Sequence, residues 1–203
     1  RLPKNKFASS LEPLSISNFN FYLKPNTDLY LLSKSEISKK ILKIYKSPEH
    51  LSAGFMLIET ISKTQLNKIP NFELYDLLSD TIGFLNDLKN NPNSLVIFFF
   101  CQFVKIMGFE LNLIDIDDNK QALTNIIIDT GNVLINEKSY HNKIFKMNNE
   151  IANKLYEISC SNLDSIENIE LNKNEFTILN NFFSVYFSYH LDFSFVLKSG
   201  LYF

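Results

Sequence analysis

An apolar run between residues 92 and 109 is the feature that most constrains how this chain can fold. Pro92 suits the first turn of a helix, the Asn-Ser pair that follows can cap that turn, and Gly108 can supply the left-handed residue that ends it. The run is shorter than the ~20 apolar residues of a membrane span, and Gln102 and Lys105 interrupt it. It therefore predicts a helix buried on nearly all sides, at the centre of a compact helical domain, and no membrane segment.

Amphipathic segments lie on both sides of this run. Ser47 can cap a helix whose first turn contains Pro48, and Asn71 opens a second helix with a leucine-rich stripe. Helical periodicity returns over residues 147–159 and over the phenylalanine-rich residues 174–191, which we assign to the core. Because the connections between these segments are short, they predict an antiparallel bundle.

The N-terminal part of the chain has a different period. Residues 11–32 alternate as two strands, with a break at Ser17–Asn18 that a bulge would accommodate and a turn at residues 24–28. A single hairpin is marginal in water. We therefore expect further strands of the same sheet to precede Arg1, and we expect helical periodicity to begin at Ser35.

The segment after the central run is acidic and loop-like. Residues 125–135 predict a small hairpin around Gly131. The aspartates just before it, Asp115, Asp117 and Asp118, lack the glycine and glutamate spacing of an EF-hand loop, so we predict a solvated loop and no metal.

Composition and motifs exclude several classes of function. The formal net charge is -2, which argues against a protein that coats nucleic acid with its whole surface. Cys101 and Cys160 form no disulfide framework and fit a reducing compartment. The sequence has no zinc spacing, nucleophile motif or glycine-rich phosphate loop, and its three histidines, His50, His141 and His190, are far apart.

Basic residues gather at the N-terminal end. Cationic groups release counterions from phosphates and aromatic faces stack on unpaired bases, so this end can bind single strands; a lysine-rich solvated surface is the alternative. The residues concerned are Arg1, Lys4, Lys6, Lys34, Lys39, Lys40, Lys43 and Lys46, with Tyr22, Tyr30 and Tyr45 among them.

Five motifs occur in an order that resembles the RecO family of bacterial recombination mediators. Residues 1–14 resemble its basic stretch R-x-x-K-S-R-F-x-x-x-L-Q-P-F, late in the family's OB-fold. The others are residues 51–59 (L-x-x-A-x-Y-L-L-E), 71–78 (N-x-E-L-F-x-L-L), 98–109 (F-x-L-x-L-L-x-x-L-G-F) and 189–199 (Y-x-x-H-L-G-x-x-x-L-x-S).

The resemblance implies an α+β chain that is N-terminally truncated: the remainder of an OB-fold over residues 1–33, then a helical bundle over residues 34–203. The insertion at residues 112–146 lacks the four zinc-binding cysteines of many relatives, so packing alone would hold it. Members of this family have no catalytic residues and no cofactor. They bind single- and double-stranded DNA, anneal strands, bind RecR and the acidic tail of the single-stranded-DNA-binding protein, and assist loading of RecA.

The predicted function is therefore that of a cytoplasmic, nucleoid-associated DNA-repair mediator and not an enzyme. Residue matching places phosphate contacts on Arg1, Lys4 and Lys6, and charge alone adds Lys39, Lys40 and Lys43. An acidic, aromatic-ended partner tail needs a cation beside an apolar groove, and Lys105 and Lys198 are the candidates. The alternatives are a helical protein-interaction adaptor without DNA binding and an enzyme with a dispersed site.

Overall fold

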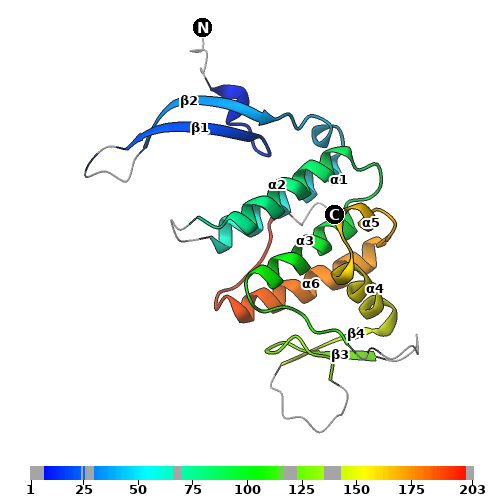
Figure 1. The fold of residues 1–203 in the computed structure, drawn as a ribbon. Coiled ribbons are helices and arrows are strands. Elements are labelled where there is room, and N and C mark those ends of the chain that lie inside the picture. The colour runs from blue at the N-terminus through cyan, green and yellow to red at the C-terminus, as the bar shows by residue number, and fades with distance from the viewer. Residues whose placement is uncertain are drawn as a thin grey trace.

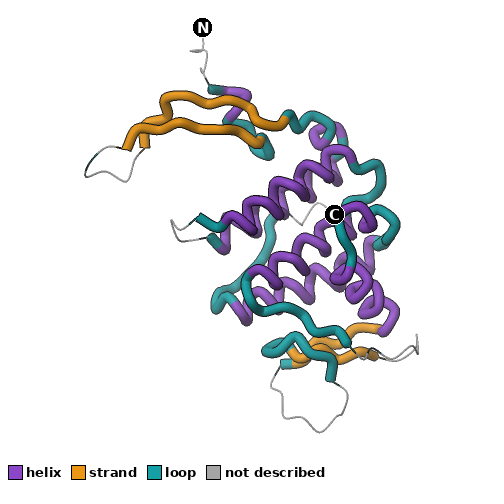
Figure 2. The backbone as a smooth tube through the Cα atoms, viewed as in Figure 1, coloured by secondary structure: helices purple, strands orange, loops and turns teal. Residues whose placement is uncertain are grey.

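The computed structural model describes residues 7–23, 25, 30–65, 70–114, 116, 123–134 and 143–199. A hairpin of β1 (Ile16–Leu23) and β2 (Tyr30–Lys39) lies at one end of a group of helices, and a second small sheet of β3 (Leu123–Ile127) and β4 (Ile144–Asn148) lies at the other end (Figures 1 and 2). The α+β class is thereby confirmed. In the part of the chain that the structure describes, no helix is long and apolar enough to cross a membrane.

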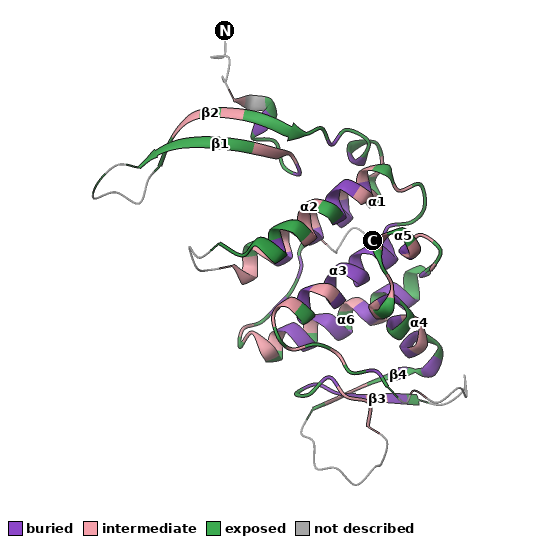
Figure 3. Cartoon of the chain, viewed as in Figure 1, coloured by how far each residue is buried: buried purple, intermediate pink, exposed green. Residues whose placement is uncertain are grey.

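The predicted central helix is α3 (Asn93–Ile106), and it is buried along most of its length (Figure 3). It packs against α1 (Pro48–Thr64), α2 (Phe72–Asp87), α4 (Asn149–Cys160), α5 (Leu163–Ile166) and α6 (Lys173–His190). Phe100 contacts Phe183 and Phe187 of α6 with ring centroids 5.3 and 5.4 Å apart. The prediction of a helix buried on nearly all sides is confirmed.

The cap of α3 differs from the prediction. Pro92 occupies the N-cap position, and no side chain caps the helix there. The side-chain amide of Asn93 instead donates to the Leu171 carbonyl at 3.2 Å, and the Ser94 hydroxyl donates to the Ile169 carbonyl. These side chains were predicted to cap the helix, but they fasten it to the segment before α6. The left-handed residue after the helix is Gly108, with φ 84°, as predicted.

The other helix starts agree with the sequence. Ser47 and Asn71 cap α1 and α2, as predicted, by accepting from the His50 and Leu74 amides. Helix α4 begins at Asn149, two residues later than the predicted start, because residues 144–148 pair with β3. The short helix α5 was not predicted.

The N-terminal hairpin is antiparallel, with irregularities between Ile16 and Ser17 and between Asn20 and Phe21. The first lies one residue before the predicted bulge. The helical period predicted from Ser35 is wrong, because β2 continues to Lys39 and keeps its backbone paired with β1. The predicted domain boundary at residue 33 falls inside β2, and we propose that the β region extends to Lys39.

The insertion contains part of the predicted hairpin and one strand that was missed. The Leu134 amide donates to the Asn125 carbonyl at 2.8 Å, and Gly131 has φ 68° at the turn. On its other edge β3 pairs with β4, whose last two residues were predicted to begin a helix. Among the described residues no group of histidine, cysteine and carboxylate side chains could hold a metal ion.

Contacts with α6 hold the insertion and Phe109, which lies just before it. The Tyr186 hydroxyl donates to the Phe109 carbonyl at 2.8 Å, and the His190 Nε2 lies 2.9 Å from the Ile128 carbonyl. The His190 ring also stacks on Phe109 at 4.6 Å, nearly parallel. A polar contact from His190 therefore adds to apolar packing in holding the insertion, and a hydrogen bond and ring stacking hold Phe109 before it.

Two of the family-like motifs meet at the C-terminal end of the described chain. Glu59 of α1 accepts from the amides of Lys198 and Ser199 at 3.0 Å and from the Ser199 hydroxyl at 2.6 Å. Lys63, one turn further along α1, lies 3.0 Å from the same carboxylate. Burial opposes ionisation of Glu59, but these hydrogen bonds outweigh it and lower its pKa to about 2.

Candidate nucleic-acid interface

Residues 39–46, which we name the basic loop, connect the end of β2 to α1. Ile41 and Ile44 are buried and anchor the loop, so the residues between them face solvent. Asn86 of α2 accepts from the amides of Leu42 and Lys43 at 3.0 and 2.9 Å. Two buried side chains and two backbone hydrogen bonds therefore hold the loop in place.

The four lysines of the basic loop differ in how free their charges are. Lys40 and Lys46 are exposed and form no ion pair with another described residue. Lys43 lies 2.7 Å from Asp87, whose pKa its hydrogen bond and charge lower. Both partners are about two-thirds exposed, so this pair contributes little and a phosphate can replace the carboxylate.

Lys39 has a second, structural contact. Its side chain runs back over α2 and fills the space beside Gly83, where a Cβ atom would collide with its ammonium group. The ammonium group of Lys39 therefore lies against the C-terminal half of α2, although the residue as a whole is exposed. Among the three lysines predicted from charge alone to contact phosphate, Lys40 has the fewest contacts with other described residues.

The predicted contacts Arg1, Lys4 and Lys6 lie outside the described residues. The residues that follow them form a short 3-10 turn, Ala8–Ser10, and the Ser35 hydroxyl of β2 donates to the Ser10 hydroxyl. This turn and the basic loop line one cavity of about 280 Å³, which we name the basic cleft. Its lining residues are Ser9, Glu12, Ser15, Ile37, Lys39, Lys40, Ile41, Leu42 and Tyr45.

The predicted aromatic partners of the lysines are only partly brought together. Tyr45 lines the basic cleft, and its hydroxyl donates to the Pro13 carbonyl. Burial, and then the charge of Glu12, raise the pKa of Tyr45, so its hydroxyl remains a donor at neutral pH. Tyr22 and Tyr30 lie at the opposite end of the hairpin from Lys39.

A row of exposed aromatic rings on the hairpin was not singled out as a site. The centroids of Phe19 and Phe21 are 6.4 Å apart, and those of Phe21 and Tyr30 are 6.1 Å apart. Each ring is between about two-fifths and three-fifths exposed. The alternation of Phe19 and Phe21 in the sequence is the signal that identifies this apolar face.

Lys105, but not Lys198, borders a described cavity. A hollow of about 720 Å³ lies between α3, α4 and the start of the insertion, with Leu111, Ile114 and Tyr156 among its apolar lining. Lys105 lies at this hollow, 3.4 Å from Glu110 in an exposed ion pair. The Lys198 amide is held by Glu59, and its exposed side chain lines none of the described cavities.

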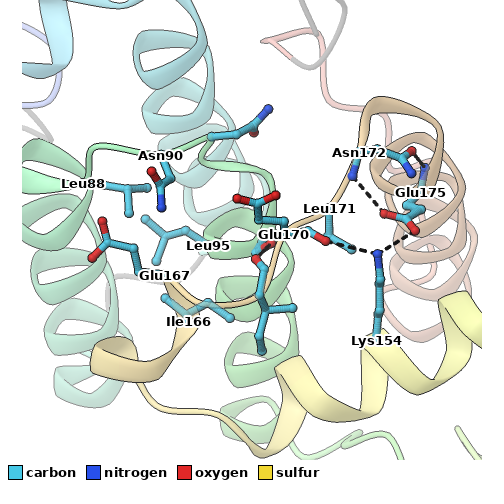
Figure 4. Close-up of a pocket in the computed structure, with 13 residues that line it drawn as sticks. Leu88, Asn90, Leu95, Lys154, Ile166, Glu167, Glu170, Leu171, Asn172 and Glu175 are labelled. Atoms are coloured by element: carbon cyan, nitrogen blue, oxygen red, sulfur yellow. Dashed lines mark hydrogen bonds and ion pairs between the residues drawn. The ribbon is translucent and has the colours of Figure 1, made fainter.

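A further pocket of about 460 Å³ lies where α3, α4, α5 and α6 meet (Figure 4). Its lysine, Lys154, is already bound to Glu175 at 2.7 Å and to the Glu170 carbonyl at 3.2 Å. Glu167 and Glu170 add two carboxylates to the lining. Because like charges repel, this pocket suits neither a phosphate backbone nor an acidic peptide.

The fold defines a class of protein: a helical domain with a lysine-rich loop at the base of a β-hairpin. Residues 46–198 match the family model described as Recombination protein O C terminal, so the chain belongs to that family. This shows that the family named from the five motifs is correct.

Two curated relatives carry the name DNA repair protein RecO. The protein from Chloroherpeton thalassium is 30% identical over 112 residues, which are 55% of this chain and 43% of the relative. The protein from Rhodopirellula baltica is 26% identical over 105 residues, which are 52% of this chain and 38% of the relative. The matched part of the chain therefore spans less than half the length of each relative.

Proposed function

We propose that this chain acts in DNA repair and recombination by binding DNA at the basic loop. The observation that carries the proposal is the geometry of that loop: Ile41, Ile44 and Asn86 fix it, and Lys40 and Lys46 are exposed and form no ion pair with another described residue. The names of the relatives support the same role. Phosphate contacts release condensed counterions, which favours binding to single and double strands alike.

Annealing of complementary strands follows from charge neutralisation and requires no covalent step. Lysines reduce the repulsion between two phosphate backbones and hold the strands close enough to pair. Arg1, Lys4 and Lys6 extend the same surface in this proposal, because they directly precede the turn that lines the basic cleft. Strand annealing and assistance in RecA loading are thus functions of binding alone.

The β-hairpin supports an OB-like N-terminal region. A two-stranded sheet with exposed Phe19, Phe21 and Tyr30 on one face is unfavourable in water unless further sheet or a partner covers that face. Further strands of an OB-fold would bury these rings and give the hairpin a second layer. The basic loop then lies at the junction of the β region and the helices.

The acidic tail of a single-stranded-DNA-binding protein fits the hollow beside Lys105 better than any surface near Lys198. Leu111, Ile114 and Tyr156 supply apolar contacts for an aromatic side chain, and Lys105 supplies a cation at the edge. Its weak pair with Glu110 must open to receive the tail carboxylate. RecR is a second proposed partner.

The electrostatic mechanism is tested by replacing Lys39, Lys40 and Lys43 with Gln together, which keeps most of each stem and removes three charges. The slope of log affinity against log salt should fall by about one for each lost phosphate contact, and annealing of labelled complementary strands should slow. A matched control replaces the exposed residues Lys89, Lys146 and Lys173 with Gln and changes the net charge equally.

Two outcomes would refute the mechanism. If affinity does not change with salt, phosphate contacts are not the basis of binding. If the control lowers affinity as much as the loop variant, net charge and not the basic loop is responsible. Absence of DNA binding, together with saturable binding of an acidic peptide beside Lys105, would favour the adaptor alternative.

A further inference from the structure

The basic cleft contains more than phosphate-binding charge. Ile37 is 39% exposed, Tyr45 43% and Leu42 65%, and all three line the cleft beside the stems of Lys39 and Lys40. A surface that only neutralises phosphates has no use for exposed apolar side chains. These side chains provide a face for a flat, largely apolar group next to a cation.

The aromatic side chain of the cleft is held in place. The Tyr45 hydroxyl donates to the Pro13 carbonyl, and the preceding residue, Ile44, is fully buried. Asn86 fixes the backbone of Leu42 on the same loop. Little freedom of the Tyr45 ring and of the loop backbone therefore remains to be lost when a ligand packs against this face, which favours binding.

Charge decides which part of a nucleotide enters the cleft. Glu12 lies in the lining, so its carboxylate repels a phosphate from the interior. Lys40 is exposed at the same cleft and pairs with no described carboxylate. A phosphate is therefore favoured at the Lys40 side, and the uncharged part of the nucleotide is favoured inside.

We infer that the basic cleft binds one unpaired nucleobase of a single strand, with Tyr45 and Leu42 packed against the base and Lys40 bound to a flanking phosphate. The cavity of about 280 Å³ is close to the lower end of the range for small-molecule pockets, as a single base requires. The inference rests on the proposed DNA binding and deepens it. It distinguishes unpaired from paired strands, because a paired base cannot leave the stack without cost.

The test compares two labelled oligonucleotides of eight residues, one of thymidines and one of abasic tetrahydrofuran residues with the same charge. Fluorescence anisotropy at fixed, low salt measures the affinity of the chain for each. The variants are Tyr45→Ala, Tyr45→Phe and Leu42→Ser. Tyr189→Ala is the matched control, because Tyr189 is 42% exposed on α6, away from the cleft.

We expect the unchanged chain to bind the thymidine oligonucleotide about tenfold more tightly than the abasic one, as stacking on one aromatic ring provides. Tyr45→Ala should remove most of that preference and leave the abasic affinity within about twofold, and Leu42→Ser should reduce the preference in part. Tyr45→Phe keeps the ring and loses only the hydroxyl contact with Pro13, so it should keep most of the preference, and Tyr189→Ala should keep all of it.

Equal affinity of the unchanged chain for the two oligonucleotides would overturn the base-binding inference while leaving phosphate binding intact. A Tyr45→Ala variant that loses the same factor with both oligonucleotides would overturn it too, because the ring would then act only on the fold. Failure to bind either oligonucleotide at low salt would refute the proposed DNA binding itself. The three failures are therefore distinguishable.

Discussion

The contact between Glu59 and the C-terminal segment gives a quantitative prediction for Glu59→Gln. The carboxylate accepts from the amides of Lys198 and Ser199 and from the Ser199 hydroxyl. A glutamine has one accepting oxygen in place of two, so part of this set loses its partner. Donors that were bonded to a charged group are then left unsatisfied, at about 1–3 kcal/mol each when they are shielded from water.

The pKa of Glu59 gives an independent magnitude. It falls from an ordinary value of 4.5 to about 2, which corresponds to about 3 kcal/mol at about 1.4 kcal/mol per pKa unit. The side chain is 19% exposed, and solvent screening lowers this contribution to about 2 kcal/mol. We therefore expect Glu59→Gln to reduce the free energy of unfolding by about 2 kcal/mol at pH 7.

The pH dependence of this loss has a definite sign. Because the pKa of Glu59 is lower in the folded state, its contribution is complete above about pH 4.5 and is lost as the pH falls toward 2. At pH 3.5 about two-fifths of the contribution should be gone. The difference in unfolding free energy between the unchanged chain and Glu59→Gln should therefore narrow as the solution is acidified.

Urea unfolding followed by far-ultraviolet circular dichroism at pH 7, 5 and 3.5 measures these differences. Glu157→Gln is the control, because Glu157 is an exposed carboxylate on α4 and forms no described ion pair. Hydrogen exchange at the Ser199 amide reports whether the segment detaches locally. A difference that stays constant with pH, or a Glu59→Gln variant as stable as Glu157→Gln, would refute the reasoning.

Two further predictions concern the insertion and the hollow beside α3. Gly131→Ala should lower the free energy of unfolding by about 1–3 kcal/mol, since φ is 68° and the new Cβ atom would lie 2.7 Å from the Tyr186 hydroxyl. Gly108→Ala, with φ 84° but nothing within 4 Å, should cost only about 1 kcal/mol, and equal losses in urea unfolding would contradict the steric argument. Lys105→Glu should weaken binding of an acidic, phenylalanine-ended peptide at least tenfold in anisotropy titrations, whereas Glu110→Gln should leave it unchanged or tighten it.

The sequence predicted the helices that are stabilised by residues within or next to the helix itself. The buried helix α3 follows from its own apolar run, and the starts of α1 and α2 follow from Ser47 and Asn71, because a cap and the helix it begins are adjacent in sequence. The sheet of the insertion was harder to predict. Strand β4 forms because β3, some twenty residues earlier, offers an edge.

The wrong predictions share a physical cause: a residue can form its hydrogen bonds with a partner that is distant in sequence as well as with a neighbour. Asn93 was predicted to cap its own helix, yet its side-chain amide donates a hydrogen bond to the Leu171 carbonyl. The serine- and lysine-rich end of β2 resembles an exposed helix in sequence, and only its pairing with β1 keeps it extended. Glu59 and Ser199 both lie in family-like motifs, but nothing in the sequence indicates that the Ser199 hydroxyl donates to the Glu59 carboxylate.

The basic loop shows why charge along a sequence is an incomplete guide to a binding surface. Lys39, Lys40 and Lys43 are close in sequence, but the fold places Lys39 over α2 and Lys43 beside Asp87. Lys39 and Lys40 both line the cleft and are exposed, but the Lys39 ammonium lies against α2, whereas Lys40 forms no ion pair with a described residue. Since an exposed ion pair contributes at most about 1 kcal/mol, Lys43 exchanges Asp87 for a phosphate at small cost, whereas moving Lys39 also removes its contact with α2 beside Gly83. Lys40 and Lys43 should therefore dominate the salt dependence, and Lys39→Gln alone should affect stability more than affinity.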